Sequence, residues 1–118
     1  MPLPTPVLRA WCGVTLAPEP VEGEAWVIAA TPPPGAPPLA KPGPTSKEEL
    51  WRRLDQTGVT WSEVALRSEG WDCAGALLVG LSRARAMRLA QKLRRWAVLR
   101  VTTQSREVLY TGINDRAR

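Results

Sequence analysis

The chain has 118 residues, of which 44% are hydrophobic, and this length is enough for one domain that folds without a metal or disulfide staple. It contains no histidine, which excludes imidazole acid–base chemistry and histidine metal sites. Its net charge of +5 is unevenly spread: residues 1–81 carry six Lys and Arg against nine Asp and Glu, whereas residues 82–118 carry ten against two. A basic C-terminal third favours an anionic partner such as nucleic acid, and a solvated helix face explains it equally well.

The N-terminal residues, the apolar runs and the cysteines indicate the cellular compartment of the protein. Residues 1–6 lack the basic start and apolar run of a signal peptide, and the longest apolar run, 74–79, is too short to span a bilayer. Cys12 and Cys73 lie far apart, so we expect two free thiols in a reducing compartment. Thirteen Arg against three Lys are typical of a GC-rich genome. We therefore expect a cytoplasmic protein of bacterial or phage origin with no membrane association, no metal and no cofactor.

The first part of the chain is rich in strand-forming residues. Residues 7–16 combine β-branched and aromatic residues between prolines, which predicts a strand that Pro18 and Pro20 end. Whether the segment 1–23 joins the main sheet stays open at this point. Residues 24–31, with Ala-Trp-Val-Ile-Ala-Ala at their centre, predict a strand buried on both faces, and Pro32 ends it.

A proline-rich segment separates this strand from the first predicted helix. Residues 31–44 contain seven prolines, which lack a backbone donor and favour an extended, stiff loop. The loop either connects two elements or docks a proline-binding partner. Thr45 and Ser46, each followed three residues later by Glu48 or Glu49, form overlapping capping boxes, and Gly58 supplies a C-terminal stop. We expect a helix over 46–57.

The second half alternates strands with one further helix. Residues 59–67 and 72–79 predict two strands joined by a turn at 68–70, and hence an antiparallel hairpin. Ser82 opens a predicted amphipathic helix over 82–96. Two more strands, 97–103 and 107–111, and a frayed tail at 114–118 complete the chain.

These elements define a fold class. From residue 24 the order is β-α-β-β-α-β plus one extra C-terminal strand, which predicts an α+β, ferredoxin-like split βαβ domain. We expect a single domain over 1–118 with a core at 24–111, an extension at 1–23 and a tail at 112–118. The antiparallel sheet carries both helices on one face, and strands 26–30 and 73–79 lie at its centre. The other face then needs a cover from the N-terminal segment, a second subunit or a ligand.

Four short segments resemble a known family in their order and spacing. They are Trp-Val-Ile-Ala-Ala-Thr-Pro at 26–32, Ser-Lys-Glu-Glu-Leu at 46–50, Leu-Leu-Val-Gly-Leu-Ser-Arg-Ala-Arg-Ala at 77–86 and Trp-Ala-Val-Leu at 96–99. They make residues 24–111 similar to DUF3293, a small bacterial domain of unknown function. That family usually has polar amide residues where this chain has Thr31, residues 47–49 and residues 95–96. The resemblance implies the fold and no activity.

The second predicted helix carries a basic stripe on the face opposite its apolar side. Its members are Arg85, Arg88, Lys92 and Arg95, with Arg83, Arg94 and Arg100 nearby. They are candidate contacts for an anion or for nucleic-acid phosphates, or simply an outer helix face. Residues 72–79 offer no aromatic side chain on which bases could stack, so we do not expect single strands to bind on the sheet.

Six tryptophans are more than one small core normally contains. Trp51 and Trp96 lie on predicted helix faces that point to the sheet and are expected in the core. The other four are candidates for a protein interface, simplest as a homodimer that covers the open sheet face: Trp11, Trp26, Trp61 and Trp71.

The first functional hypothesis is a non-catalytic binding or regulatory module that acts through protein–protein contact. The alternative is an electrostatic nucleic-acid-binding protein that uses the basic helix. A third is an enzyme or small-ligand sensor with a pocket under the proline loop. Without histidine, Cys73, Glu63 and Asp72 are the remaining candidate catalytic groups, and no base partner is visible for them, so we do not expect an enzyme.

Overall fold

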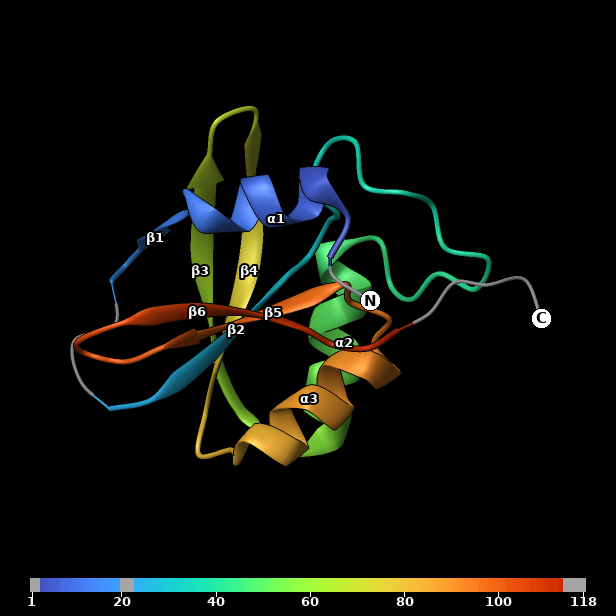
Figure 1. Cartoon of the computed structure of the whole chain (residues 1–118). Helices are drawn as coiled ribbons and strands as arrows, with labels where there is room; N and C mark the ends of the chain where they lie inside the picture. Colours follow the sequence, from blue (N-terminus) through green and yellow to red (C-terminus); the bar gives the residue numbers. More distant parts are fainter. Residues whose placement is uncertain (1–2, 20–22, 114–118) are drawn as a thin grey trace.

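The computed structural model describes residues 3–19 and 23–113, which form an α+β fold with a six-stranded antiparallel sheet that curls into a half-barrel (Figure 1). The helices in this part of the chain are α1 (Thr5–Cys12), α2 (Lys47–Thr57) and α3 (Arg83–Lys92). The strands are β1 (Thr15–Ala17), β2 (Ala25–Ala29), β3 (Thr60–Ser68), β4 (Trp71–Val79), β5 (Ala97–Val101) and β6 (Arg106–Tyr110).

The strand order across the sheet is β1-β3-β4-β2-β5-β6, and every neighbouring pair is antiparallel. The central positions of β4 and β2 confirm the prediction that the two most apolar strands lie in the middle. All five residues of β2 are buried, which explains why this strand shows no polar alternation. The predicted hairpin is β3–β4, and the predicted extra C-terminal strand is β6, which pairs with β5.

Helices α2 and α3 both pack on one face of the sheet. The Ser46 hydroxyl accepts a hydrogen bond from the Glu49 amide at 3.2 Å, and Gly58 ends α2 with a left-handed φ of 77°. At the start of α3, the Ser82 hydroxyl accepts from the Arg85 amide at 3.2 Å. The buried residues that α2 and α3 share with the sheet form one cluster: Trp26, Ile28, Ala30, Leu50, Leu54, Ala76, Leu78, Leu81, Ala86, Ala90, Leu93 and Val98.

The predicted C-terminal end of the second helix is wrong. Helix α3 ends at Lys92, and Arg94 adopts a left-handed φ of 61° before β5 begins. Residues other than glycine rarely adopt this backbone conformation, so no signal in the sequence indicated that the helix ends here. Because the helix ends early, residues 94–96 lie outside it, and their side chains contact the proline-rich loop.

The predicted strand over 7–16 is also wrong, because most of it forms helix α1. Pro6 stands in the first turn, where a missing amide hydrogen does no harm. Val7, Ala10 and Trp11 are buried at the spacing of one helix face and lie on the side of the sheet opposite α2 and α3. The short strand β1 then pairs with β3, so the N-terminal segment both joins the sheet and covers its second face.

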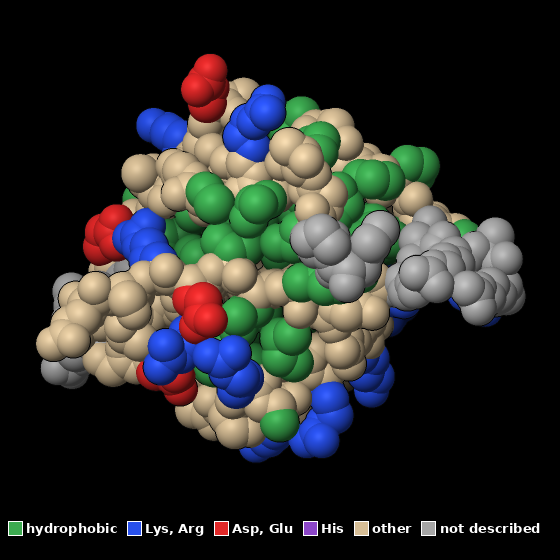
Figure 2. All heavy atoms as spheres, in the orientation of Figure 1, with side chains coloured by type: hydrophobic (Ala, Val, Ile, Leu, Met, Phe, Trp, Pro, Cys, Tyr) green, Lys and Arg blue, Asp and Glu red, His purple; other side chains and the backbone are tan. Residues whose placement is uncertain are grey.

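The cover over the second face is incomplete. Figure 2 shows hydrophobic side chains gathered in the middle of one face, between α1 and the β5–β6 hairpin, with charged side chains around them. Val108 of β6 is only partly buried against the cluster on this side. The twisted sheet curls into an open half-barrel, because its edge strands β1 and β6 do not pair with each other. The predicted frayed tail at 114–118 lies outside the described residues.

Candidate functional site

Three of the four tryptophans predicted at an interface lie in the core. Trp26 is fully buried on the α2–α3 side, where its indole nitrogen donates to the Leu81 carbonyl oxygen at 3.1 Å. Trp11 and Trp71 are buried on the α1 side and meet edge to face, with ring centroids 5.2 Å apart. The interface expectation is corrected for these three residues. Helices α2 and α3 cover Trp26, and α1 supplies the cover for Trp11 and Trp71 that a second subunit was expected to give.

Trp61 has a different environment from the other three. It is half-buried, and its ring packs against Trp51 with centroids 4.7 Å apart. Its indole nitrogen donates to Asp55 Oδ1 at 2.9 Å. These contacts tie the start of β3 to α2.

The basic stripe is shorter than predicted. Arg85, Arg88 and Lys92 are exposed on α3, and no described residue forms an ion pair or side-chain hydrogen bond with their charged groups. Arg95 lies beyond the helix and is only 9% exposed, so it is not part of this surface. Three cations at helical spacing therefore remain of the predicted four.

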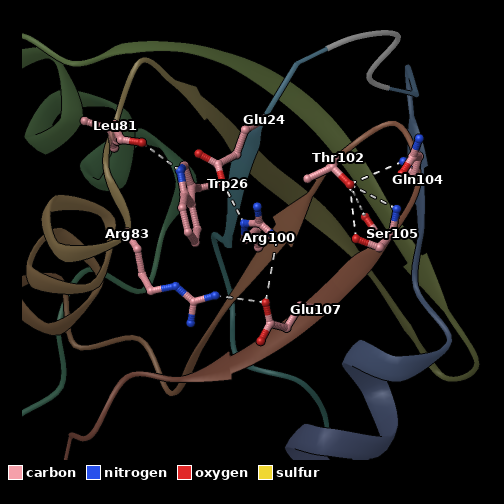
Figure 3. A network of polar contacts seen from close by, with 9 residues as sticks. All are labelled: Glu24, Trp26, Leu81, Arg83, Arg100, Thr102, Gln104, Ser105 and Glu107. Atoms are coloured by element: carbon pink, nitrogen blue, oxygen red, sulfur yellow. Dashed lines mark hydrogen bonds and ion pairs between the residues drawn. The ribbon is translucent and has the colours of Figure 1, made fainter.

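Arg83 and Arg100, which lie near the stripe, form ion pairs with glutamates. Figure 3 shows Arg83 and Arg100 converging on Glu107, with Arg100 also reaching Glu24. Arg83 Nη2 lies 3.1 Å from Glu107 Oε1, and Arg100 Nε lies 2.6 Å from Glu24 Oε2. These ion pairs join the first turn of α3 to β5, to β6 and to the residue before β2, and they neutralise the positive charge there.

A cavity of about 350 Å³ lies beneath the proline-rich loop. Its outer wall is the loop 31–45, which connects β2 to α2 along one side of the molecule (Figure 1). Its inner wall includes Trp11 of α1, Ala29 of β2, and Trp96 and Ala97 at the start of β5. The lining is mainly apolar, and Arg94 and Arg95 are its two charged side chains. The third sequence hypothesis placed a pocket at this position.

Three consecutive residues after α3 hold the proline loop in place. Arg94 Nε donates to the Lys41 carbonyl at 2.9 Å, Arg95 Nη2 donates to the Pro44 carbonyl at 2.6 Å, and Trp96 Nε1 reaches the Pro37 carbonyl at 3.4 Å. A proline cannot donate a hydrogen bond, but its carbonyl accepts one. Within the loop, the Ala36 amide donates to the Pro33 carbonyl at 3.1 Å, and the turn at 94–96 supplies three further donors from outside.

Close backbone contact also fixes the loop. A Cβ atom placed on Gly43 would overlap the carbonyl oxygen of Leu93, the residue that caps α3. Only glycine allows the loop to approach the helix end this closely. Gly43 and the three donors thus position the outer wall of the cavity.

Arg95 is the unusual side chain of this site. It is 9% exposed, its Nε has no hydrogen-bond partner, and none of the described carboxylates pairs with it. Burial lowers the pKa of Arg95 from its ordinary value to about 10, and Cys73 acts in the opposite direction. The group still carries its charge at pH 7, so the chain holds a nearly buried cation with one carbonyl as its hydrogen-bond acceptor.

The candidate catalytic groups do not assemble into a site. Glu63 lies 3.8 Å from Lys47 and Asp72 lies 3.7 Å from Arg67, and these four side chains are exposed or half-exposed. Cys73 is half-buried and free. In residues 3–19 and 23–113, no three Cys, Asp or Glu side chains come close enough to hold a metal ion.

The comparisons with known proteins give no identification. No protein-family model, curated protein or solved structure matches this chain significantly. Among the described helices, none has the length and apolar character needed to cross a membrane. The functional argument therefore rests on the geometry of the pocket and of the α3 surface.

Sequence reasoning missed the place of Arg95 for a physical reason. The sequence pattern placed Arg95 on the same helix face as Arg88 and Lys92, because the apolar residues keep their helical spacing through Trp96. The contact that decides its place is with Pro44, 51 positions earlier in the chain. The proline run itself was the available signal, because a loop with few backbone donors of its own needs donors from other segments.

Proposed function

We propose that this protein is a non-catalytic binding module that holds a small, mainly apolar molecule beneath its proline loop. The observation that carries the proposal is the cavity of about 350 Å³, which lies at the lower end of the size range of small-molecule pockets. Pro33, Ala36, Trp11 and Trp96 contribute apolar wall, and a few polar groups lie among them. This combination is typical of ligand sites.

The lining favours binding over catalysis. Its polar side chains are Arg94, Arg95, Thr31 and Thr45, and none of the described lining residues offers a carboxylate or thiol. General acid–base chemistry needs a group that exchanges a proton near neutral pH, and the hydroxyls of Thr31 and Thr45 need a neighbouring base to act as nucleophiles. The pocket therefore supports a sensor or carrier role within a regulatory module.

Fluorescence of the chain's own tryptophans tests this proposal, because Trp11 and Trp96 line the cavity. We expect straight-chain C6 to C10 amides, alcohols or acids to change the fluorescence saturably. Ala36→Phe fills the cavity and should weaken this binding at least about tenfold. Ala84→Phe, the same change on the exposed face of α3, should leave binding unaltered. The absence of saturable binding by every member of the series would refute the proposal.

A second candidate function is supported by the exposed cations of α3. Arg85, Arg88 and Lys92 face solvent without an ion-pair partner among the described residues, which suits contact with phosphates along a nucleic acid. Binding of this kind is electrostatic, insensitive to sequence and weakened by salt.

A triple variant separates this second function from the first. Arg85→Gln, Arg88→Gln and Lys92→Gln together should abolish retention of a mixed duplex at low salt and should leave the pocket unaffected. The matched control is Arg52→Gln with Arg53→Gln on α2, where both arginines lie near Glu49. Unchanged affinity of the triple variant would rule out the stripe as the binding surface.

The protein–protein hypothesis stays a prediction with less support than the pocket. Trp61 remains the only one of the four predicted interface tryptophans that is not buried among the described residues. Molar mass in solution, measured by light scattering at low and high salt, tests the homodimer form directly. A salt-independent dimer would return this hypothesis to first place.

The finer description of the fold is also a proposal. We propose that strands β2 to β5 with α2 and α3 form a ferredoxin-like split βαβ unit, extended by β1 and β6. The internal order β3-β4-β2-β5 and its antiparallel pairing support this. Membership of DUF3293 stays a prediction from the sequence resemblance.

A further inference from the structure

The hydrogen-bonding capacity of Arg95 is mostly unused. A guanidinium carries five N–H donors in a planar fork. Among the described residues, one acceptor is available to it, the Pro44 carbonyl oxygen at 2.6 Å from Nη2, and the buried Nε has none. Because buried donors without partners and buried charges without counterions are costly, each one in a native protein needs an explanation. Its pKa of about 10 means that the charge is present at neutral pH.

The position of Arg95 is fixed by contacts on both sides of its own backbone. Its amide donates to the Ala90 carbonyl at 2.9 Å, and its carbonyl accepts from the Thr111 hydroxyl at 2.5 Å. Thr111 is itself buried. The side chain is therefore held at the cavity wall by α3, by the residue that follows β6 and by the proline loop. A group that is fixed before its partner arrives loses little entropy on binding.

The remainder of the cavity suits an apolar molecule. The loop contributes prolines, which have no backbone N–H, so this wall offers few donors to a ligand. A ligand rich in hydroxyl groups would leave them unpaired against Ala36, Pro33 and Trp11. A hydrocarbon or aromatic body loses nothing there and gains contact with the tryptophan rings.

The charge of the site selects the polar end of the ligand. A planar carboxylate matches the planar guanidinium and carries one negative charge, which one buried cation can balance. The second charged side chain of the lining, Arg94, is half-exposed, and its Nε donates to the Lys41 carbonyl. A phosphate monoester brings up to two charges and three oxygens with charge to neutralise, which a mainly apolar wall with one buried cation satisfies less well than it satisfies a carboxylate.

We infer that the ligand of this pocket is a small amphipathic monocarboxylate, bound with its carboxylate on Arg95 and its apolar body against the proline and tryptophan walls. This inference rests on the proposed function, because it names the chemical class of the molecule that the pocket holds.

A pair of probes that differ only at the polar end tests it on the unaltered protein. Octanoate and octanamide have the same chain and nearly the same shape, and their binding is followed by tryptophan fluorescence at constant ionic strength. We expect octanoate to bind at least about tenfold more tightly than octanamide, as charge-assisted hydrogen bonds exceed neutral ones. Octyl phosphate should bind more weakly than octanoate.

Variants assign the preference to one side chain. Arg95→Met removes the charge but keeps an unbranched apolar body, and it should reduce octanoate binding to the level of octanamide. Arg95→Lys keeps the charge without the planar fork and should retain part of the preference, so it serves if the methionine variant does not fold. Arg88→Gln, which removes one charge from the exposed face of α3, should leave the preference unchanged.

The outcomes separate this inference from the function on which it rests. Equal binding of octanoate and octanamide, or tighter binding of octyl phosphate, would overturn the monocarboxylate while leaving an apolar pocket in place. A preference that survives both Arg95 substitutions would overturn the role of Arg95. Binding of none of the three probes would overturn the proposed function itself.

Discussion

The two faces of the sheet treat their buried polar groups differently. On the α2–α3 face, the fully buried Trp26 donates its indole hydrogen to the Leu81 carbonyl. On the α1 face, Trp71 is also buried, but its indole nitrogen has no hydrogen-bond partner among the described residues. The same holds for Nε of Arg95, which lines the cavity. The cavity is on this second side. One face is packed and satisfied, whereas the other keeps open space and unused donors.

This contrast indicates that one side of the sheet mainly stabilises the fold, whereas the other side mainly provides the binding site. A satisfied and closed core stabilises the fold, while unsatisfied polar groups cost stability and persist where a ligand can use them. Substitutions on the two sides should therefore have different consequences. Those on the α2–α3 side should affect folding, and those on the α1 side should affect binding more than folding.

The largest effect is expected where the two regions meet. Gly43→Ala forces a methyl group onto the Leu93 carbonyl, so the proline loop must move away from the end of α3. We expect a loss of about 3 kcal/mol in the free energy of unfolding and loss of octanoate binding. Urea unfolding followed by circular dichroism measures the first quantity.

Another glycine provides the control for this substitution. A Cβ on Gly13 would lie 3.8 Å from the Ser68 hydroxyl, which is an ordinary contact. Gly13→Ala should therefore change stability by less than about 1 kcal/mol. Equal losses in the two variants would show that the close approach at Gly43 is not what holds the loop.

An intermediate effect distinguishes the two buried indoles. Trp26→Phe removes a satisfied hydrogen bond and leaves the Leu81 carbonyl unpaired, so we expect a loss of about 2 kcal/mol. Trp71→Phe removes a nitrogen that has no hydrogen-bond partner within residues 3–19 and 23–113, and we expect a loss of about 1 kcal/mol. Chemical denaturation of both variants gives the comparison. A larger loss at Trp71 would contradict the view that the α1 side is the less satisfied one.

The smallest effect on stability is expected at the group most important for binding. Arg95→Met removes a buried cation that has no anionic partner in the described part of the chain. The unfolding free energy of this variant at pH 7 should therefore stay within about 1 kcal/mol of the unaltered chain or exceed it. A loss above about 2 kcal/mol would show that the hydrogen bond from Arg95 to the Pro44 carbonyl, which helps to hold the loop, outweighs the cost of burying the charge.

The pH dependence of this comparison has a definite sign. Burial lowers the pKa of Arg95 to about 10 in the folded chain, below its ordinary value, so above pH 10 the unfolded chain retains the proton more strongly. The unaltered protein should therefore gain stability relative to Arg95→Met as pH rises through 10. Parallel unfolding curves from pH 8 to pH 11 measure this difference. A constant difference would show that Arg95 is not desolvated.

The parts of the fold set by local chemistry could be predicted from the sequence. Ser46 and Ser82 begin helices because their hydroxyls accept hydrogen bonds from the first turn, and Gly58 ends a helix because its backbone adopts a left-handed φ. The apolar strands β2 and β4 lie at the centre of the sheet, as their composition predicts. Helix α1 was missed although its buried residues repeat at helical spacing, because β-branched and aromatic content suggested a strand.

The site was less predictable than the fold. The proline run marked the position of the pocket, but nothing local showed that Arg94 would leave the helix with a left-handed backbone. The burial of Arg95 depends on a carbonyl 51 positions away, and the burial of Trp11 depends on Trp71. Such pairings arise from the tertiary arrangement and leave no periodic trace in the chain.

The seven prolines of the loop have a consequence for the kinetics of ligand capture. Because each pyrrolidine ring restricts the backbone in the unfolded chain as well, ordering this segment removes fewer conformations than ordering a flexible loop of equal length would. A wall that is already rigid does not have to close around its ligand. Entry and exit should therefore be single-step events, and the rate of association should rise linearly with ligand concentration without a slow conformational phase.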